Sequence, residues 1–175
     1  MTARTRSALL PRLRVALVND AFWSQYLDSF ERGDRPERSL HVAVFHEPFL
    51  SWVLEGKKPV ESRFSQNQVA PYGAVRVGDA VVLKQVAGPA LGICHVRAAW
   101  SYQLDPRTWQ FIRDEFSELL CATEDEFWSA RESARFATLM SLEEVRRLPE
   151  IEYPKSDRRG WVVECGPIHQ QSLDL

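Results

Sequence analysis

Apolar side chains in the first part of the chain are spaced as in one helix. Four of them recur at intervals of three or four positions: Phe22, Tyr26, Leu27 and Phe30. This spacing predicts a helix over residues 19–31, which Asn19 can cap and Gly33 ends. About the first dozen residues, to near Pro11, contain few apolar side chains and are expected to form a mobile arm. The polar residues 34–39 then separate this extension from the main fold.

Strand patterns dominate the rest of the chain. Runs that alternate apolar and polar side chains, or that are rich in β-branched residues, predict strands over residues 40–45, 60–64, 80–86, 91–100 and 161–165. Gly88 and Pro89 make a tight connection, so residues 80–100 are predicted to form an antiparallel hairpin. Residues 136–148 combine an alternating pattern with a Ser-x-x-Glu cap pattern, and we favour a strand there.

Three further helices are predicted from apolar spacing and capping residues. Residues 49–54 pair at helical spacing, and Pro48 and Gly56 are suited to the first turn and the end of that helix. Asp105 is expected to cap a helix with these apolar residues on one side: Trp109, Ile112, Phe116 and Leu119. Another helix is expected to begin at Thr123, which opens a Thr-x-x-Glu capping box.

The composition is that of a globular protein with one main domain. The chain has 175 residues, of which 45% are hydrophobic and 26% charged. No apolar run approaches the roughly 20 residues of a membrane helix, and no signal-peptide pattern occurs at the N-terminus, so we expect a cytoplasmic protein without a membrane partner. Cys94, Cys121 and Cys165 are odd in number and far apart, which predicts buried thiols rather than disulfides or a zinc site. We expect no metal and no cofactor.

Charge and element order narrow the fold class. The net charge of −2 indicates no polyanionic partner by itself, but residues 52–97 are locally basic and residues 105–152 are acidic. Helices and strands follow one another without a regular βαβ rhythm, and the central hairpin is antiparallel. The sequence therefore predicts a small α+β barrel rather than a doubly wound sheet. We divide the chain into an N-terminal arm and helix (1–38), a main domain (39–168) and a C-terminal tail (169–175).

Three motifs follow one another in the main domain. They are GKKPVESR at residues 56–63, which has the pattern GxKxxExR, VGD at 77–79 followed by VVLK at 81–84, and GICHV at 92–96. Together they resemble the ASCH domain family over about residues 39–168. The resemblance implies a PUA-like fold, a small mixed β-barrel flanked by helices. Residues 1–38 lie outside it as an N-terminal helical extension.

The first motif concentrates chemistry between a helix and a strand. Lys58 follows the C-terminal end of the helix, where the helix dipole favours a cation, and strand alternation puts Glu61 and Arg63 on one face. An ammonium, a carboxylate and a guanidinium together can pair with a base edge and with phosphate oxygens. The alternative interpretation is an ordinary ion-pair cluster at the surface.

Three residues outside this motif extend the candidate site. Lys84 adds a second phosphate contact if its side chain projects to the same side of the barrel. Trp52, on the helix, and Tyr72, in the loop before the hairpin, offer surfaces on which an unpaired base can stack. The predicted ligand-binding set is therefore Lys58, Glu61, Arg63, Lys84, Trp52 and Tyr72.

The resemblance implies recognition of RNA or of a modified nucleoside or nucleotide, by binding or by hydrolysis. In a hydrolase, Lys58 activates a nucleophile or stabilises an oxyanion, and Glu61 is the general acid or base. The family's N4-acetylcytidine amidohydrolases have a threonine nucleophile where this chain has Glu61, and no histidine pair for a ribonuclease is evident. We therefore prefer binding, with a regulatory protein that takes a nucleotide-like ligand as a third possibility. Replacing Lys58 by alanine is expected to abolish binding with little loss of stability.

Overall fold

The computed structural model describes residues 7–155 and 157–167 of the chain. Within these residues the elements are α1 (Leu9–Ala16), α2 (Ala21–Arg32), β1 (Leu40–Phe45), α3 (Phe49–Leu54), β2 (Val60–Ser65), β3 (Ala80–Gln85), β4 (Ala90–Gln103), α4 (Pro106–Phe116), α5 (Asp125–Ser129), β5 (Phe136–Ile151) and β6 (Trp161–Cys165). The predicted C-terminal tail (169–175) and residues 1–6 of the predicted arm lie outside the described residues.

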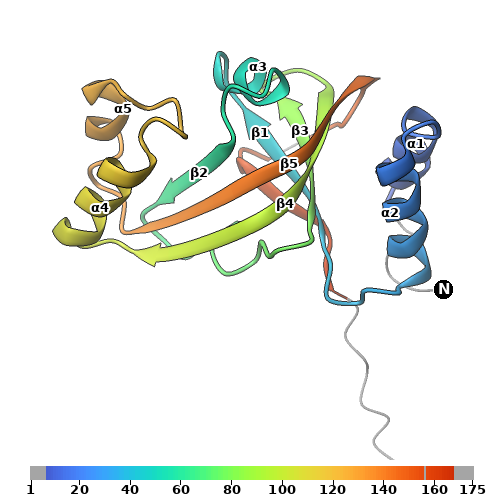
Figure 1. Ribbon diagram of the computed structural model, residues 1–175, viewed down its shortest axis with the longest axis horizontal. Helices are drawn as coiled ribbons and strands as arrows, with labels where there is room; N and C mark the ends of the chain where they lie inside the picture. Colours follow the sequence, from blue (N-terminus) through green and yellow to red (C-terminus); the bar gives the residue numbers. More distant parts are fainter. Residues whose placement is uncertain (1–6, 156, 168–175) are drawn as a thin grey trace, which may run out of the picture.

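A mixed six-stranded sheet with the order β2-β5-β4-β3-β1-β6 forms the centre of the protein. Strands β1 and β3 are parallel, and the other neighbouring strands are antiparallel. The long strands β4 and β5 curve across the molecule, with α1 and α2 at one end of the sheet and α4 and α5 at the other (Figure 1). This half-barrel with flanking helices confirms the predicted α+β class, a small mixed barrel flanked by helices.

The hairpin and the ambiguous strand are confirmed. Strands β3 and β4 pair in antiparallel register from Ala80, opposite His95, to Lys84, opposite Ala90. Residues 136–148 lie within β5, which continues to Ile151 and pairs with β4 along most of its length. Alternation therefore outweighs the cap pattern at these residues, because β5 packs between two neighbouring strands.

The N-terminal extension is more ordered than predicted. Residues 9–16 form the helix α1, so a mobile arm reaching to residue 12 is wrong for this part of the chain. Helix α2 begins at Ala21, and its cap is the Asp20 carboxylate, which accepts a hydrogen bond from Trp23 N, rather than Asn19. Gly33, with φ of 74°, ends α2 as predicted, because the left-handed region suits glycine.

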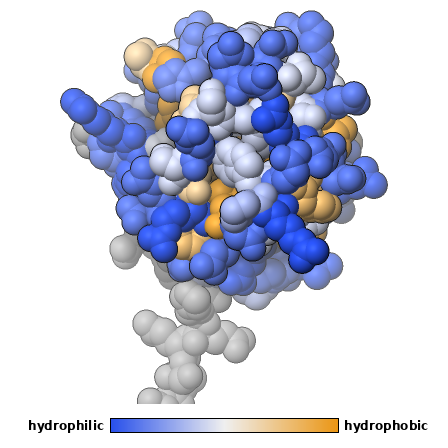
Figure 2. Space-filling view, turned by 90° about the vertical axis from the view of Figure 1, so that its left-hand side faces the viewer, coloured by the Kyte–Doolittle hydropathy of each residue, from blue (hydrophilic) through white to orange (hydrophobic). Residues whose placement is uncertain are grey.

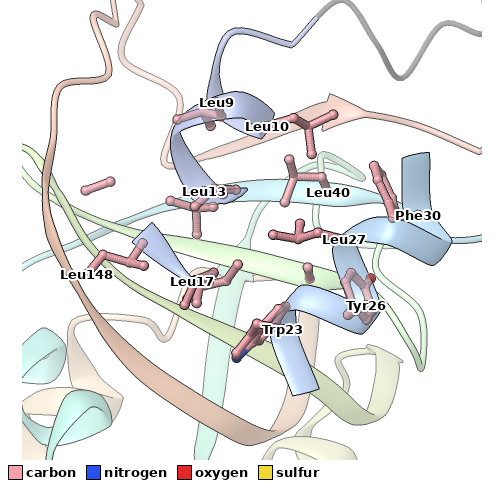
Figure 3. Close-up of a cluster of buried hydrophobic side chains, with 14 of the residues drawn as sticks. Leu9, Leu10, Leu13, Leu17, Trp23, Tyr26, Leu27, Phe30, Leu40 and Leu148 are labelled. Carbon is pink, nitrogen blue, oxygen red and sulfur yellow. The ribbon is translucent and has the colours of Figure 1, made fainter. Parts of the chain in front are cut away.

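Helices α1 and α2 share a hydrophobic core with the sheet. Side chains from both helices point toward each other and toward the strands (Figure 3), and the buried members include Leu9, Leu10, Leu13, Leu17, Trp23, Tyr26, Leu27, Phe30, Leu40 and Leu148. The short leucine-rich segment of α1 is stable because burying each of these side chains contributes about 1.5–3 kcal/mol. A second cluster, which includes Leu50, Val53 and Met140, fills the inside of the half-barrel next to α3.

A third cluster packs α4 and α5 against β2 and β5, and it includes Ile112, Trp128 and Leu139. Asp105 caps α4 as predicted, because its carboxylate accepts a hydrogen bond from Thr108 N at 2.7 Å. The prediction that α5 begins at Thr123 is wrong. The helix begins at Asp125 after an extended Glu124, and no side chain caps it.

The predicted turn at Gly78 contains a buried carboxylate. Asp79 is fully buried and accepts hydrogen bonds from Ser39 N, Arg76 N and His41 Nε2 at 2.7–2.9 Å. Because Trp161 Nε1 donates to His41 Nδ1 at 3.1 Å, the histidine carries its proton on Nε2. The sequence pattern indicated a turn at Asp79, but not this network, which joins the residue before β3 to His41 on β1 and Trp161 on β6.

The three cysteines differ in their burial. Cys94 and Cys165 are buried as predicted, whereas Cys121 is partly exposed. Burial, assisted by the nearby Glu61 carboxylate, raises the pKa of Cys94 above its usual range.

Among residues 7–155 and 157–167, no helix has the length and apolar character needed to cross a membrane.

Candidate functional site

The GxKxxExR segment folds as a tight passage from α3 into β2. Gly56 adopts a φ of 76°, and the amide groups of Lys57 and Lys58 both donate hydrogen bonds to the carbonyl of Trp52 at the end of α3. Pro59 follows, and its carbonyl accepts a hydrogen bond from Leu142 N on β5. This closure turns the chain sharply, so the Lys57 side chain faces solvent while the Lys58 side chain enters the protein.

Lys58 and Glu61 form a buried ion pair. Lys58 is 3% exposed and Glu61 is 6% exposed, and Lys58 Nζ lies 3.2 Å from Glu61 Oε2. The ammonium donates its hydrogen bond to the carbonyl of Val60, at 2.7 Å. Glu61 Oε2 is buried and accepts no hydrogen bond from any described residue. The Lys58 ammonium compensates the charge of this oxygen, but a buried carboxylate oxygen that accepts no hydrogen bond has still lost part of its hydration without full replacement.

Arg63 bridges the two open edges of the sheet. Its Nε donates to Glu61 Oε1 at 3.0 Å, and its Nη1 donates to the carbonyls of Val44 at 2.9 Å and Gly160 at 3.3 Å. The guanidinium also lies over the rings of Phe45 and Trp161, at 4.8 and 5.5 Å. Strands β2 and β6 are the two edge strands of the sheet. Arg63 lies on β2 and contacts β1 and the residue before β6, so it connects one edge of the sheet with the other.

Arg131, which the sequence patterns did not indicate, completes the charged group. Its guanidinium lies 3.7 Å from the centre of the Phe127 ring, and its Nη1 donates to the Phe127 carbonyl at 2.8 Å. Partial burial lowers the pKa of Arg131, and the Glu61 carboxylate opposes this shift. The residue lies just after α5 in an acidic stretch of sequence, so only the packing of α5 against β2 brings it to the site.

These side chains line a hollow of about 390 Å³ at the seam of the half-barrel, which we call the Glu61 hollow. Its walls are Val44, Phe45, His46, Phe49, Lys58, Glu61, Ser62, Arg63, Phe64, Phe127 and Arg131. Three cationic side chains therefore surround one carboxylate, and several phenylalanine rings form the apolar part of the wall. The face of the protein that carries α4, α5 and β2 is otherwise mostly hydrophilic (Figure 2).

The predicted stacking residues lie elsewhere. Trp52 packs edge-on against Phe49 with ring centres 5.6 Å apart, and Tyr72 packs against Phe136 at 5.0 Å. Neither residue lines the Glu61 hollow, so we leave both out of the proposed site. The aromatic residues that line the hollow include Phe49 and Phe127, whose ring centres are 6.1 Å apart.

Lys84 lines a second hollow of about 820 Å³, the Lys84 hollow, which adjoins the first. The two hollows share Val44, His46 and Arg63 in their walls. Lys84 therefore lies on the same side of the barrel as the GxKxxExR segment, but it does not enter the Glu61 hollow. Within the described part of the chain, no group of three or more His, Cys, Asp or Glu side chains is arranged to hold a metal ion.

Comparison with known proteins identifies the fold. Neither a family model nor a curated protein matches the amino-acid sequence. Among solved structures, ASCH from Zymomonas mobilis matches 65% of this chain and 73% of its own, with 15% identity and a TM-score of 0.51. A tyrosine-to-phenylalanine mutant of that protein matches with a TM-score of 0.52 and 16% identity, over 65% of this chain and 76% of the mutant chain.

A further similar structure covers more of the chain. Protein EF3133 from Enterococcus faecalis matches 83% of this chain and 99% of its own, with 12% identity and a TM-score of 0.50. The chain therefore has the fold of ASCH domain proteins, as the three sequence blocks indicated. At these identities the likeness concerns the fold, and the function has to be inferred from the site.

Proposed function

We propose that this protein binds RNA, or a modified nucleoside or nucleotide, with one base in the Glu61 hollow. The observation that carries the proposal is Glu61, which lines the hollow and whose buried Oε2 accepts no hydrogen bond from the described residues, although it is ion-paired with Lys58. An amino or imino N–H at the edge of a base would supply that donor. A ligand that satisfies a buried carboxylate gains affinity because it removes an existing penalty.

The size and the walls of the hollow also suit a base. Its volume of about 390 Å³ lies within the range of small-molecule sites, which is roughly 300–1,000 Å³. Phe49 and Phe127 offer aromatic contacts, and stacking on such rings is the usual way in which proteins hold unpaired bases. The excess of positive charge from Lys58, Arg63 and Arg131 favours an anionic ligand.

A small hydrolase acting on RNA or on a modified nucleoside is the second candidate. The same oxygen favours it, because Glu61 Oε2, which accepts no hydrogen bond, can accept a proton from a water molecule while Lys58 Nζ, 3.2 Å away, stabilises developing negative charge. We place binding first because Lys58 already donates to Val60 and Arg63 already donates to Glu61. Both groups are thereby held in place as parts of a fixed recognition surface.

The test separates binding from turnover. Ribonucleosides, N4-acetylcytidine and short single-stranded RNAs are titrated calorimetrically into the wild type, Glu61→Gln and the control Lys57→Met. Product formation is followed by chromatography on the same samples. Lys57 is a suitable control because its side chain is 65% exposed and, among the described residues, forms an ion pair with Glu55 alone. We expect binding without product in the wild type and in the control.

The Glu61→Gln variant should bind at least about tenfold more weakly, because one charged acceptor is lost. Product that disappears in Glu61→Gln would favour the hydrolase. Equal affinity of Glu61→Gln and the wild type for every ligand would refute the role of the carboxylate.

A further inference from the structure

Lys84 is a buried lysine without an acidic partner. It is 6% exposed, and its Nζ donates to the carbonyls of Gln85 at 3.0 Å and Gly88 at 2.6 Å. No carboxylate of the described residues forms an ion pair with it, and its third N–H has no protein acceptor there. Buried lysines are normally paired, because an isolated charge is expensive to remove from water. Two backbone carbonyls therefore satisfy only part of this ammonium.

The surroundings of Lys84 add positive charge instead of compensating it. Burial and the neighbouring Lys155 both lower the pKa of Lys84. The cationic residues in the walls of the Lys84 hollow are Arg63, Lys84, Lys155, Arg158 and Arg159, and the acidic ones are Glu150, Glu152 and Asp157. Asp157 is already engaged, because it forms ion pairs with Lys155 and Arg159. Arg158 has no such partner among the described residues.

Arg63 connects this hollow with the Glu61 hollow. Its Nε and Nη1 are held by Glu61, Val44 and Gly160, which fixes the plane of the guanidinium. Its Nη2 has no hydrogen-bond acceptor within the described residues, although Arg63 lines both hollows. A guanidinium held in this way at a boundary is suited to contact a phosphate that is attached to a group in the neighbouring hollow.

We propose that the Lys84 hollow is a phosphate subsite, which binds the phosphate of a nucleotide or an RNA strand whose base occupies the Glu61 hollow. The inference rests on the proposed function and narrows it: the preferred ligand is phosphorylated, and a free nucleoside fills only half of the site. Lys84 supplies a charged donor from the wall, and Arg63 Nη2 supplies a second donor from the boundary. Arg158 adds an exposed cation at the rim.

The experiment compares ligands that differ only in phosphate. The four ribonucleosides, their 5′- and 3′-monophosphates, and inorganic phosphate are titrated into the wild type, Lys84→Met and the control Lys57→Met. We expect at least one monophosphate to bind the wild type about tenfold or more tightly than its nucleoside. The nucleoside has no phosphate and therefore cannot form the charge-assisted hydrogen bond to the cations of the Lys84 hollow. In Lys84→Met this preference should fall severalfold, because Arg63 and Arg158 remain, while the nucleoside affinity stays the same. Lys57→Met should behave like the wild type.

Each outcome decides between the two proposals. Equal wild-type affinity for a nucleoside and its monophosphates would overturn the phosphate subsite and leave the proposed function standing, as would a phosphate preference that is undiminished in Lys84→Met. Binding of inorganic phosphate that Lys84→Met abolishes, without any nucleoside binding, would support the anion site and refute the base hollow. No binding of any ligand would refute both.

If Lys84→Met fails to fold, Arg158→Gln replaces it, because Arg158 is exposed at the rim. Arg158→Gln should reduce the monophosphate preference severalfold and weaken the salt dependence of binding. An unchanged preference and salt dependence in Arg158→Gln would then overturn the subsite.

Discussion

Replacing Lys58 by methionine should destabilise the protein as well as weaken binding. The substitution removes the ammonium that lies 3.2 Å from Glu61 Oε2 and the hydrogen bond to the Val60 carbonyl. An unsatisfied buried acceptor costs about 1–3 kcal/mol, and a buried charge that loses its partner costs about 3–5 kcal/mol. Because Arg63 still pairs with Glu61, the second cost is reduced, and we expect a total loss of about 2–4 kcal/mol.

This prediction replaces the expectation from the sequence that Lys58 is dispensable for folding. Urea denaturation at pH 7 measures the free energy of unfolding for the wild type, Lys58→Met, Glu61→Gln and the double variant. The double variant should be more stable than the sum of the single effects predicts, because each single change leaves the other group buried without one of its charged partners. The exposed Lys57→Met should change stability by less than about 0.5 kcal/mol. A Lys58→Met protein as stable as this control would refute the reasoning.

Three further predictions concern Asp79, Arg131 and Asp20. Asp79→Asn should lower the free energy of unfolding by about 2–4 kcal/mol, measured by urea denaturation, because a buried carboxylate that accepts three hydrogen bonds is lost; a loss below about 0.5 kcal/mol would contradict this. Arg131→Ala should weaken RNA binding about tenfold in calorimetry without changing the urea midpoint, and unchanged affinity would remove Arg131 from the site. The Trp23 amide and Arg146 lower the pKa of Asp20 in the folded protein. The cap therefore contributes its full stability above the pKa of Asp20 in the unfolded chain, about 4, and loses it as the pH falls through the lower pKa of the folded state. Asp20→Asn should therefore be less stable than the wild type at pH 7, and the difference should shrink below about pH 4; a difference independent of pH would argue against the carboxylate.

Local patterns predicted the geometry of the GxKxxExR segment well. Gly56 ends α3 in the left-handed region, and alternation along β2 puts Glu61 and Arg63 on one face, where they form an ion pair. Each of these features depends on a few neighbouring residues. The burial of Lys58 was not predicted, because it depends on how α3 and β5 pack around the segment.

The residues of the candidate site that the sequence patterns did not indicate come from distant segments of the chain. Arg131 and Phe127 reach the Glu61 hollow because α5 packs on β2, and their acidic sequence context gave no signal of this contact. Gly160 meets Arg63 only because the half-barrel brings its two edge strands together. In α1, Leu9, Leu10 and Leu13 are at helical spacing and could have predicted the helix. Eight residues, however, give too short a pattern to distinguish a helix from an irregular arm.

A crystal structure of the protein with a short single-stranded RNA tests the central claim most directly. We expect a base inside the Glu61 hollow, with a base N–H within hydrogen-bond distance of Glu61 Oε2 and the attached phosphate beside Arg63 Nη2. RNA bound at another face, with the Glu61 hollow holding only water, would contradict it.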